Sequence, residues 1–95
     1  MNKTETAMTF EERIALDREI ASIFEGEERY DEMLLLASVI GEAGYVADLA
    51  AYIRVAQAAG KHKIEIQFNV AHDLRQYGRP GFVPRTHGYA KREQD

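Results

Sequence analysis

The 95-residue chain contains no cysteine. Without thiols it can form no disulfide, thiolate zinc site or iron–sulfur cluster, and it has no cysteine nucleophile. Its only two serines, Ser22 and Ser38, fall inside predicted helices and not on an exposed nucleophile turn. A glycine-rich phosphate loop and an HExxH-type metal motif are also missing. We therefore predict a protein that is not an enzyme and that has no cofactor, catalytic residue or metal ligand.

Long hydrophobic runs are absent as well. No stretch approaches the roughly 20 apolar residues of a membrane span. The N-terminus is polar and includes Glu5, unlike the apolar core of a signal peptide. We expect a cytoplasmic protein without membrane contact. Its length suits a single domain, which we place at residues 9–77, between a leader at 1–8 and an extended basic and aromatic tail at 78–95.

The formal net charge of −4 is unevenly distributed. Residues 1–60 hold 12 acidic and 5 basic residues, a net charge of −7. Residues 61–95 hold 4 acidic and 7 basic residues, a net charge of +3. The composition thus predicts an acidic body followed by a basic C-terminal segment, which could meet within one chain or between partners.

The first helix has a clear start. Thr9 and Glu12 fit a capping box, in which each side chain accepts a hydrogen bond from the backbone amide of the other residue. The apolar residues that follow recur with helical spacing. We predict a helix from Phe10 to Glu25, ended by Gly26.

Two more helices are predicted before residue 60. The second covers about Glu28–Glu42 and is apolar nearly all round, which favours burial on more than one side, either in the centre of a bundle or at a subunit interface. The third covers Tyr45–Ala59 and ends at Gly60. The side chains expected to form the core of this bundle are Leu34, Leu35, Val39, Ile40, Leu49 and Ile53.

The pattern changes after Gly60. Apolar and polar residues alternate strictly over Lys63–Val70, which is typical of a β-strand with one buried face. We therefore predict an α+β fold, predominantly α: a three-helix N-terminal bundle followed by one β-strand and an irregular basic tail. A lone strand needs a pairing partner, which could be Gly81–Arg85, the same strand in a second copy, or a sheet edge of another protein.

The segment from Arg75 to Arg92 combines basic and aromatic residues and contains no acid. Basic residues can contact phosphates and aromatic rings can stack on unpaired bases, which suits single-stranded nucleic acid. The segment could instead dock on the acids of its own chain or on a partner protein. The predicted partner-binding residues of the tail and of the strand are Arg75, Tyr77, Arg79, Phe82, Arg85, Ile64, Ile66 and Phe68.

A compact acidic patch is predicted around the first helix connection. Its members are Glu25, Glu27, Glu28, Asp31 and Glu32. It could hold the basic tail of the same chain or bind a partner. Together with Glu11, Glu12, Asp17 and Glu19 of the first helix, it could also imitate a phosphate row and so inhibit a nucleic-acid-binding machine.

A stretch of the third helix resembles the end of some small repressor and antitoxin domains. The stretch is Leu49–Gly60 followed by Lys63–Ile66, in which a last helix closes with glycine and enters a strand. The resemblance implies a helix-turn-helix regulator that binds DNA. The residues that would enter the groove, Tyr45–Ala51, offer one acid and no Arg, Lys, Gln or Asn.

Three histidines, His62, His72 and His87, do not share the spacing of a helical metal pair. His72 is the one whose neighbours, Asp73 and Arg75, could place its titration near neutrality. Taken together, these patterns predict a small interaction module, a regulator, adaptor or inhibitor, that forms a homodimer or binds another protein. Nucleic-acid binding and acidic mimicry are the alternatives.

Overall fold

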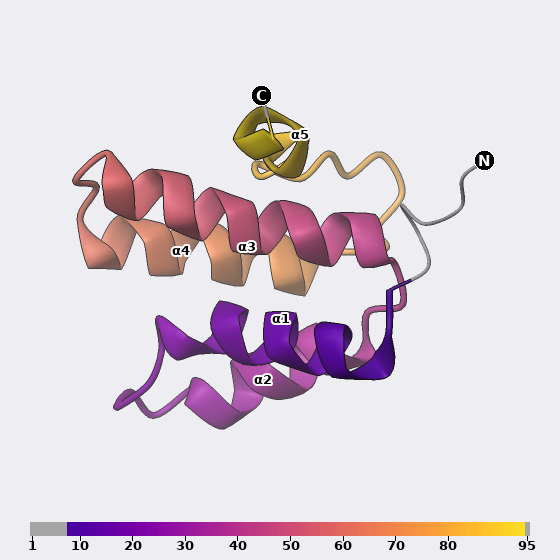
Figure 1. Cartoon of the computed structure of the whole chain (residues 1–95). Coiled ribbons are helices and arrows are strands. Elements are labelled where there is room, and N and C mark those ends of the chain that lie inside the picture. Colours follow the sequence, from indigo (N-terminus) through magenta and orange to yellow (C-terminus); the bar gives the residue numbers. More distant parts are fainter. Residues whose placement is uncertain (1–7, 95) are drawn as a thin grey trace.

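The computed structural model describes residues 8–94, so the leader predicted at 1–8 lies outside the described residues except for Met8. Within this range the chain forms five helices: α1 (Phe10–Ser22), α2 (Tyr30–Val39), α3 (Ala43–Ala58), α4 (Lys63–Gln76) and α5 (Tyr89–Gln94). Central in the fold is α3, which packs against α1, α4 and α5, while α2 packs against α1 and α4 (Figure 1). The C-terminal segment returns over α3 from the end of α4 (Figure 1).

The start of α1 confirms the predicted capping box. The Thr9 hydroxyl accepts a hydrogen bond from the Glu12 amide at 3.0 Å, and the Glu12 carboxylate accepts one from the Thr9 amide at 2.9 Å. The helix ends at Ser22, three residues before the predicted Glu25, and a turn leads into Gly26 at φ +90°. Local hydrogen bonding thus sets the start of this helix more sharply than its end.

The prediction of a β-strand at Lys63–Val70 is wrong, and so is the prediction of an α+β fold. These residues belong to α4, and no strand occurs within residues 8–94. The helix begins after His62, whose Nδ1 accepts a hydrogen bond from the Ile64 amide at 3.1 Å. The described part of the chain has an all-α fold.

The alternating pattern fits a helix as well as a strand. Residues four apart share a face in both structures. Ile66 and Val70 form one such pair and, with Leu74, are buried against the core. Ile64 and Phe68 form a second pair, which is exposed to solvent. Helix formation also satisfies the backbone groups within the segment, whereas a strand would need a partner that the described residues do not provide.

The hydrophobic core lies between α3 and the helices around it. Its largest fully buried apolar side chains are Ile20, Phe24, Met33, Val46, Leu49, Ile66 and Val70. Tyr52 also lies in this core, and its hydroxyl accepts a hydrogen bond from the Asn69 amide group of α4 at 2.8 Å.

Three of the six residues predicted to form the core are buried in it. Ile40, Leu49 and Ile53 are buried as predicted. Leu34 is only half-buried, and Leu35 and Val39 are 63% and 67% exposed. Helix α2 lies at the edge of the molecule (Figure 1), and Met33 and Ala37 are its buried residues. This helix is therefore not at the centre of the bundle, whereas its burial at a subunit interface, the other possibility, stays a prediction.

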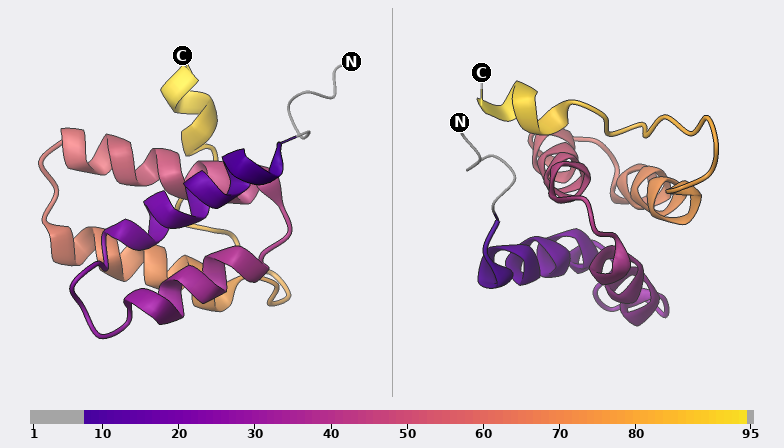
Figure 2. Two further views of the ribbon diagram at one scale, coloured as in Figure 1. Left: turned by 60° about the horizontal axis from the view of Figure 1, so that its bottom comes forward. Right: turned by 90° about the vertical axis from the view of Figure 1, so that its right-hand side faces the viewer.

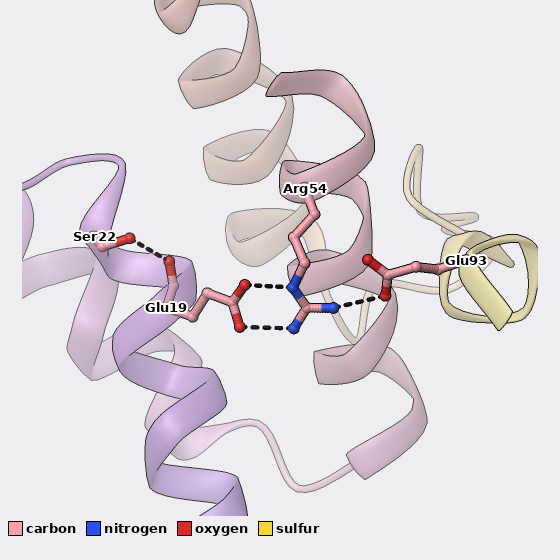
Figure 3. A network of polar contacts seen from close by, with 4 residues as sticks. All are labelled: Glu19, Ser22, Arg54 and Glu93. Carbon is pink, nitrogen blue, oxygen red and sulfur yellow. Dashed lines mark hydrogen bonds and ion pairs between the residues drawn. The ribbon is translucent and has the colours of Figure 1, made fainter. Parts of the chain in front are cut away.

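Arg54 of α3 links two helices that are far apart in the sequence. Its guanidinium donates to both carboxylate oxygens of Glu19 in α1, at 2.6 and 2.7 Å, and to Glu93 in α5 at 2.6 Å (Figure 3). Exposed ion pairs contribute about 0–1 kcal/mol each. The network therefore orients α5 on α3 more than it stabilises the fold.

Candidate partner-binding surface

The outer face of α4 exposes large apolar side chains. Ile64 and Phe68, one helical turn apart, are 66% and 61% exposed. The Arg85 guanidinium lies over the Phe68 ring, 5.3 Å from its centre, and donates to the Asn69 side-chain oxygen at 2.9 Å. Ile66, predicted to share this surface, is buried because the helix turns it toward the core. We call Ile64, Phe68 and Arg85 the α4 face.

Phe82 lies beside this helix too. Its half-buried ring is 6.1 Å from the imidazole of His72 in α4. The next residue, Val83, is 72% exposed. Sequence reasoning predicted Phe82 but missed Val83, since no periodicity marks a single apolar residue in an irregular segment.

A buried carboxylate fixes the C-terminal segment to α4. Asp73 is fully buried, and its two oxygens accept hydrogen bonds from the backbone amides of Arg85 at 3.1 Å and Thr86 at 3.0 Å. Its Oδ1 is also 3.4 Å from Nδ1 of His72. The sequence singled out His72, but Asp73 is the residue that holds the segment in place.

A second carboxylate fixes the start of α5. Asp48 of α3 is half-buried, and its oxygens accept hydrogen bonds from the amides of Gly88 and Ala90, both at 2.9 Å. Tyr89, between these two residues, packs edge-on against Tyr52 with 5.2 Å between the ring centres. Asp48 and Asp73 together determine where the basic side chains of the segment lie.

We expect Asp48→Ala to release α5 without unfolding the protein. The amides of Gly88 and Ala90 lose their acceptors, so their hydrogen exchange should accelerate about tenfold or more. Exchange measured by NMR or mass spectrometry reports this directly. Gln57→Ala, an exposed change on the same helix, is the control. Unchanged exchange at Gly88 and Ala90 would show that Asp48 does not hold α5.

An open cleft of about 1070 Å³ lies between the start of α3, the segment after α4, and α5. Three predicted contact residues, Tyr77, Arg79 and Phe82, line it. The structure adds lining residues that sequence reasoning did not select: Glu42, Tyr45, Asp48, His87 and Lys91. They come from two stretches that are far apart in the sequence, 42–48 and 87–91, so no local sequence motif joins them.

Two tyrosines pack together at the wall of this cleft. The rings of Tyr45 and Tyr77 are 4.6 Å apart. Burial, and secondarily the charge of Asp73, raise the pKa of Tyr45 far above its ordinary value, and its buried hydroxyl makes no hydrogen bond within the described residues. Desolvation, helped by the Glu42 carboxylate, also raises the pKa of Tyr77. Both side chains therefore stay neutral and provide an aromatic wall.

The basic residues of the C-terminal segment differ in their surroundings. Arg75 pairs with Glu32 of α2 at 3.1 Å, and the Arg92 guanidinium lies over the Tyr89 ring at 4.3 Å. Arg79 and Lys91 are exposed at the cleft. The acidic patch thus pairs with one basic residue, Arg75, which belongs to α4, and no ion pair joins it to residues 78–94 of the tail.

The acidic patch is exposed at all five predicted positions: Glu25, Glu27, Glu28, Asp31 and Glu32. Arg29, which interrupts it, lies over the Phe24 ring at 5.3 Å. The acids of α1 do not extend the patch into a regular row, since Asp17 is buried against Arg13 and Glu19 pairs with Arg54. This interruption disfavours an imitation of a phosphate backbone.

The helix-turn-helix hypothesis would place α3 in a DNA groove. Half of this helix is buried: Tyr45, Val46, Leu49, Ala50, Ala51, Tyr52, Ile53 and Ala56. Of Tyr45–Ala51, which would enter the groove, all but Ala47 and Asp48 are buried, and Asp48 accepts the amides of Gly88 and Ala90, so this part of α3 is not available to read base edges.

Within residues 8–94 no group of three His, Asp or Glu side chains is arranged to hold a metal ion. No helix in this range has the length and apolar character needed to cross a membrane. Comparison of the chain with protein-family models, curated proteins and solved structures found no match.

Proposed function

We propose that this protein is a small, non-catalytic cytoplasmic module that binds another protein through the α4 face. The observation that supports this function is the exposure of Ile64 and Phe68 beside a positioned arginine. Adjacent exposed apolar side chains mark interaction sites more often than scattered ones. Aromatic and arginine side chains are also the residue types that contribute most to protein interfaces.

The fixed position of Arg85 adds to this proposal. Its guanidinium is held by the Phe68 ring and by Asn69, and its backbone amide is held by Asp73. A side chain that is already ordered loses less conformational entropy on binding. The α4 face therefore resembles a prepared contact surface more than a mobile basic tail.

Binding to nucleic acid is the second candidate function. Arg79 and Lys91 lie in one cleft with the aromatic rings of Tyr77 and Phe82, which is a chemistry that could hold phosphates and stacked bases. Arg75, by contrast, pairs with Glu32. Because Arg75 is already paired, fewer basic side chains are available to contact phosphates, and the affinity for nucleic acid should be lower. We therefore favour a protein partner.

We expect Phe68→Ser to abolish partner capture. Truncation of a central interface aromatic costs about 2 kcal/mol or more, which lowers capture by at least about tenfold. The measurement is affinity capture from native lysate, with and without nuclease, using the wild type and the variant side by side. Proteins that depend on Phe68 are then identified by mass spectrometry and tested for direct binding in purified form.

Leu35→Ser is the matched control. Leu35 is 63% exposed, against 61% for Phe68, but it lies on α2. This variant should capture the partner as the wild type does, and circular dichroism should show all three proteins folded. Equal capture by both variants would contradict the proposal. Loss of the captured protein on nuclease treatment would instead favour nucleic acid.

A further inference from the structure

The outer side of α4 is open to a partner. In the right-hand view of Figure 2, α4 lies at the edge of the bundle, and the chain beyond it passes over to α5. No other helix of residues 8–94 covers Ile64 and Phe68, which stay 66% and 61% exposed while α4 packs against α2 and α3. Two apolar side chains one turn apart form a ridge, and the ridge of one helix packs into the groove of another. The α4 face therefore suits the apolar side of an amphipathic helix.

The Arg85 guanidinium on this face is held in place but is only partly bonded. It donates to the Asn69 side-chain oxygen at 2.9 Å and lies over the Phe68 ring. No carboxylate of residues 8–94 lies within ion-pair distance of it. Asp73 keeps its negative charge, but it is fully buried and its oxygens accept the backbone amides of Arg85 and Thr86. The Arg85 side chain is exposed, so its other N–H donors are available to a partner.

A partner that covers Arg85 must bring an acceptor. A guanidinium that loses water without gaining a partner is strongly disfavoured, because its charge is then buried and unpaired. A carboxylate fits best, since its two oxygens match the fork of the guanidinium and the hydrogen bonds are charge-assisted. The Phe68 ring under the guanidinium and Ile64 one turn away favour apolar side chains beside that carboxylate. The α4 face thus specifies both parts of its partner.

A nucleic-acid strand fits this face less well. Phosphate binding depends on several cations along one surface, and Arg85 is the single cation of the α4 face. Of the other basic residues on and before α4, Arg75 pairs with Glu32 and Lys61 pairs with Glu65. Glu65 is also exposed on this helix, where its charge would oppose a row of phosphates. One fixed cation beside apolar side chains suits a single carboxylate on an apolar helix.

We propose that the α4 face binds an amphipathic helix of a partner protein, whose apolar side chains pack on Ile64 and Phe68 and whose Asp or Glu side chain pairs with Arg85. The proposed function is the basis of this inference, which adds the chemistry of the partner. Asn69 and Asp73 act as positioning residues, because they hold Arg85 where the carboxylate meets it. Affinity should therefore depend on the charge at position 85 as well as on the ring at position 68.

Charge variants of Arg85 test the carboxylate. The probe is the purified protein whose capture from lysate depends on Phe68, and its binding is measured by isothermal titration calorimetry. Arg85→Glu should bind it at least about thirtyfold more weakly than the wild type, because two carboxylates then face each other. Arg85→Lys keeps the charge but not the bidentate fork, so the expected loss is about three- to tenfold. Arg79→Glu, the same reversal at an exposed arginine of the cleft, should bind as the wild type does.

A chemical cross-link identifies the side chain of the partner. Arg85→Lys places an amine on the α4 face, and a carbodiimide joins an amine to a carboxylate in direct contact as an amide, itself taking up the water. Mass spectrometry of the complex should find the amine at position 85 bonded to an Asp or Glu of the partner. Around that residue, the partner's sequence should show apolar residues at helical spacing. Arg79→Lys, which places the amine at the cleft, should give no such product.

Equal binding by Arg85→Glu and the wild type would overturn this inference. So would a cross-link from position 85 to a carboxylate outside an apolar helical segment, or no cross-link there although circular dichroism shows the variant folded. In these cases the proposed function still stands if Phe68→Ser abolishes capture. If no captured protein depends on Phe68, or if nuclease releases it, the proposed function and this inference fail together.

Discussion

Replacing Asp73 with alanine is expected to lower the free energy of unfolding by about 3–4 kcal/mol. The buried carboxylate accepts the amides of Arg85 and Thr86. Without it, the Thr86 amide loses its partner in a buried site and the Arg85 amide in a half-buried one, and an unpaired buried donor costs about 1–3 kcal/mol. A domain of this size has a total stability of only about 5–15 kcal/mol. Urea unfolding followed by circular dichroism measures the loss.

Two further variants separate the hydrogen bonds of Asp73 from a general loss of charge. Asp73→Asn keeps one oxygen acceptor and should cost less, about 1–2 kcal/mol. Glu27→Ala removes an exposed carboxylate and should change stability by less than about 0.5 kcal/mol. If Asp73→Ala unfolds at the same urea concentration as Glu27→Ala, the carboxylate does not anchor the C-terminal segment.

Leu49→Ala is expected to lower the free energy of unfolding by about 2–5 kcal/mol, the range for a fully buried leucine. Leu49 lies in the centre of α3 and has no exposed surface. The substitution removes apolar contacts and leaves a cavity that the surrounding helices fill only in part. Thermal or urea unfolding gives the value.

Leu35→Ala provides the matched comparison, since it is the same chemical change on a helix of the same bundle. Leu35 is 63% exposed, so the expected change is within about 0.5 kcal/mol. Both residues belong to the core predicted from the sequence, and only one of them is buried. Equal losses for the two variants would contradict the exposed position of Leu35.

Some of the fold could be predicted from the sequence because the determining contacts are local. The capping box of Thr9 and Glu12 joins residues three apart. Gly60, at φ +80°, follows α3 at the predicted end, because a left-handed backbone favours glycine. Such features depend on spacing along the chain, which the sequence displays directly.

The sequence did not decide whether the fourth element, which starts at Lys63, is a strand or a helix. Over eight residues, the alternation of Ile64, Ile66, Phe68 and Val70 fits both periods, because residues four apart share a face in a strand and in a helix. The stripe of buried residues in α4 contains the adjacent pairs Ile66 and Gln67, Val70 and Ala71, and Asp73 and Leu74, a helical spacing that a strand with one buried face would not produce. Burial of that longer stripe against the core favours the helix.

The candidate site was predicted in part. Phe82 and Arg85 were predicted from the composition of the tail, and Phe68 from a strand that is in fact helix α4. The structure places Arg85 over Phe68 and Phe82 beside the same helix. Their proximity depends on Asp73, which the sequence presents only as a neighbour of His72. That these residues bind a partner stays a prediction.

The sequence by itself determined the absence of thiol chemistry, the split between an acidic body and a basic C-terminal segment, and the start of α1. The tertiary structure decided which apolar residues of α2 and α4 are buried and which stay in solvent. It also decided where the basic residues lie, through hydrogen bonds from Asp48 and Asp73 to distant backbone amides. Side-chain chemistry and short-range spacing are properties of the chain, whereas burial depends on which helices pack together in space.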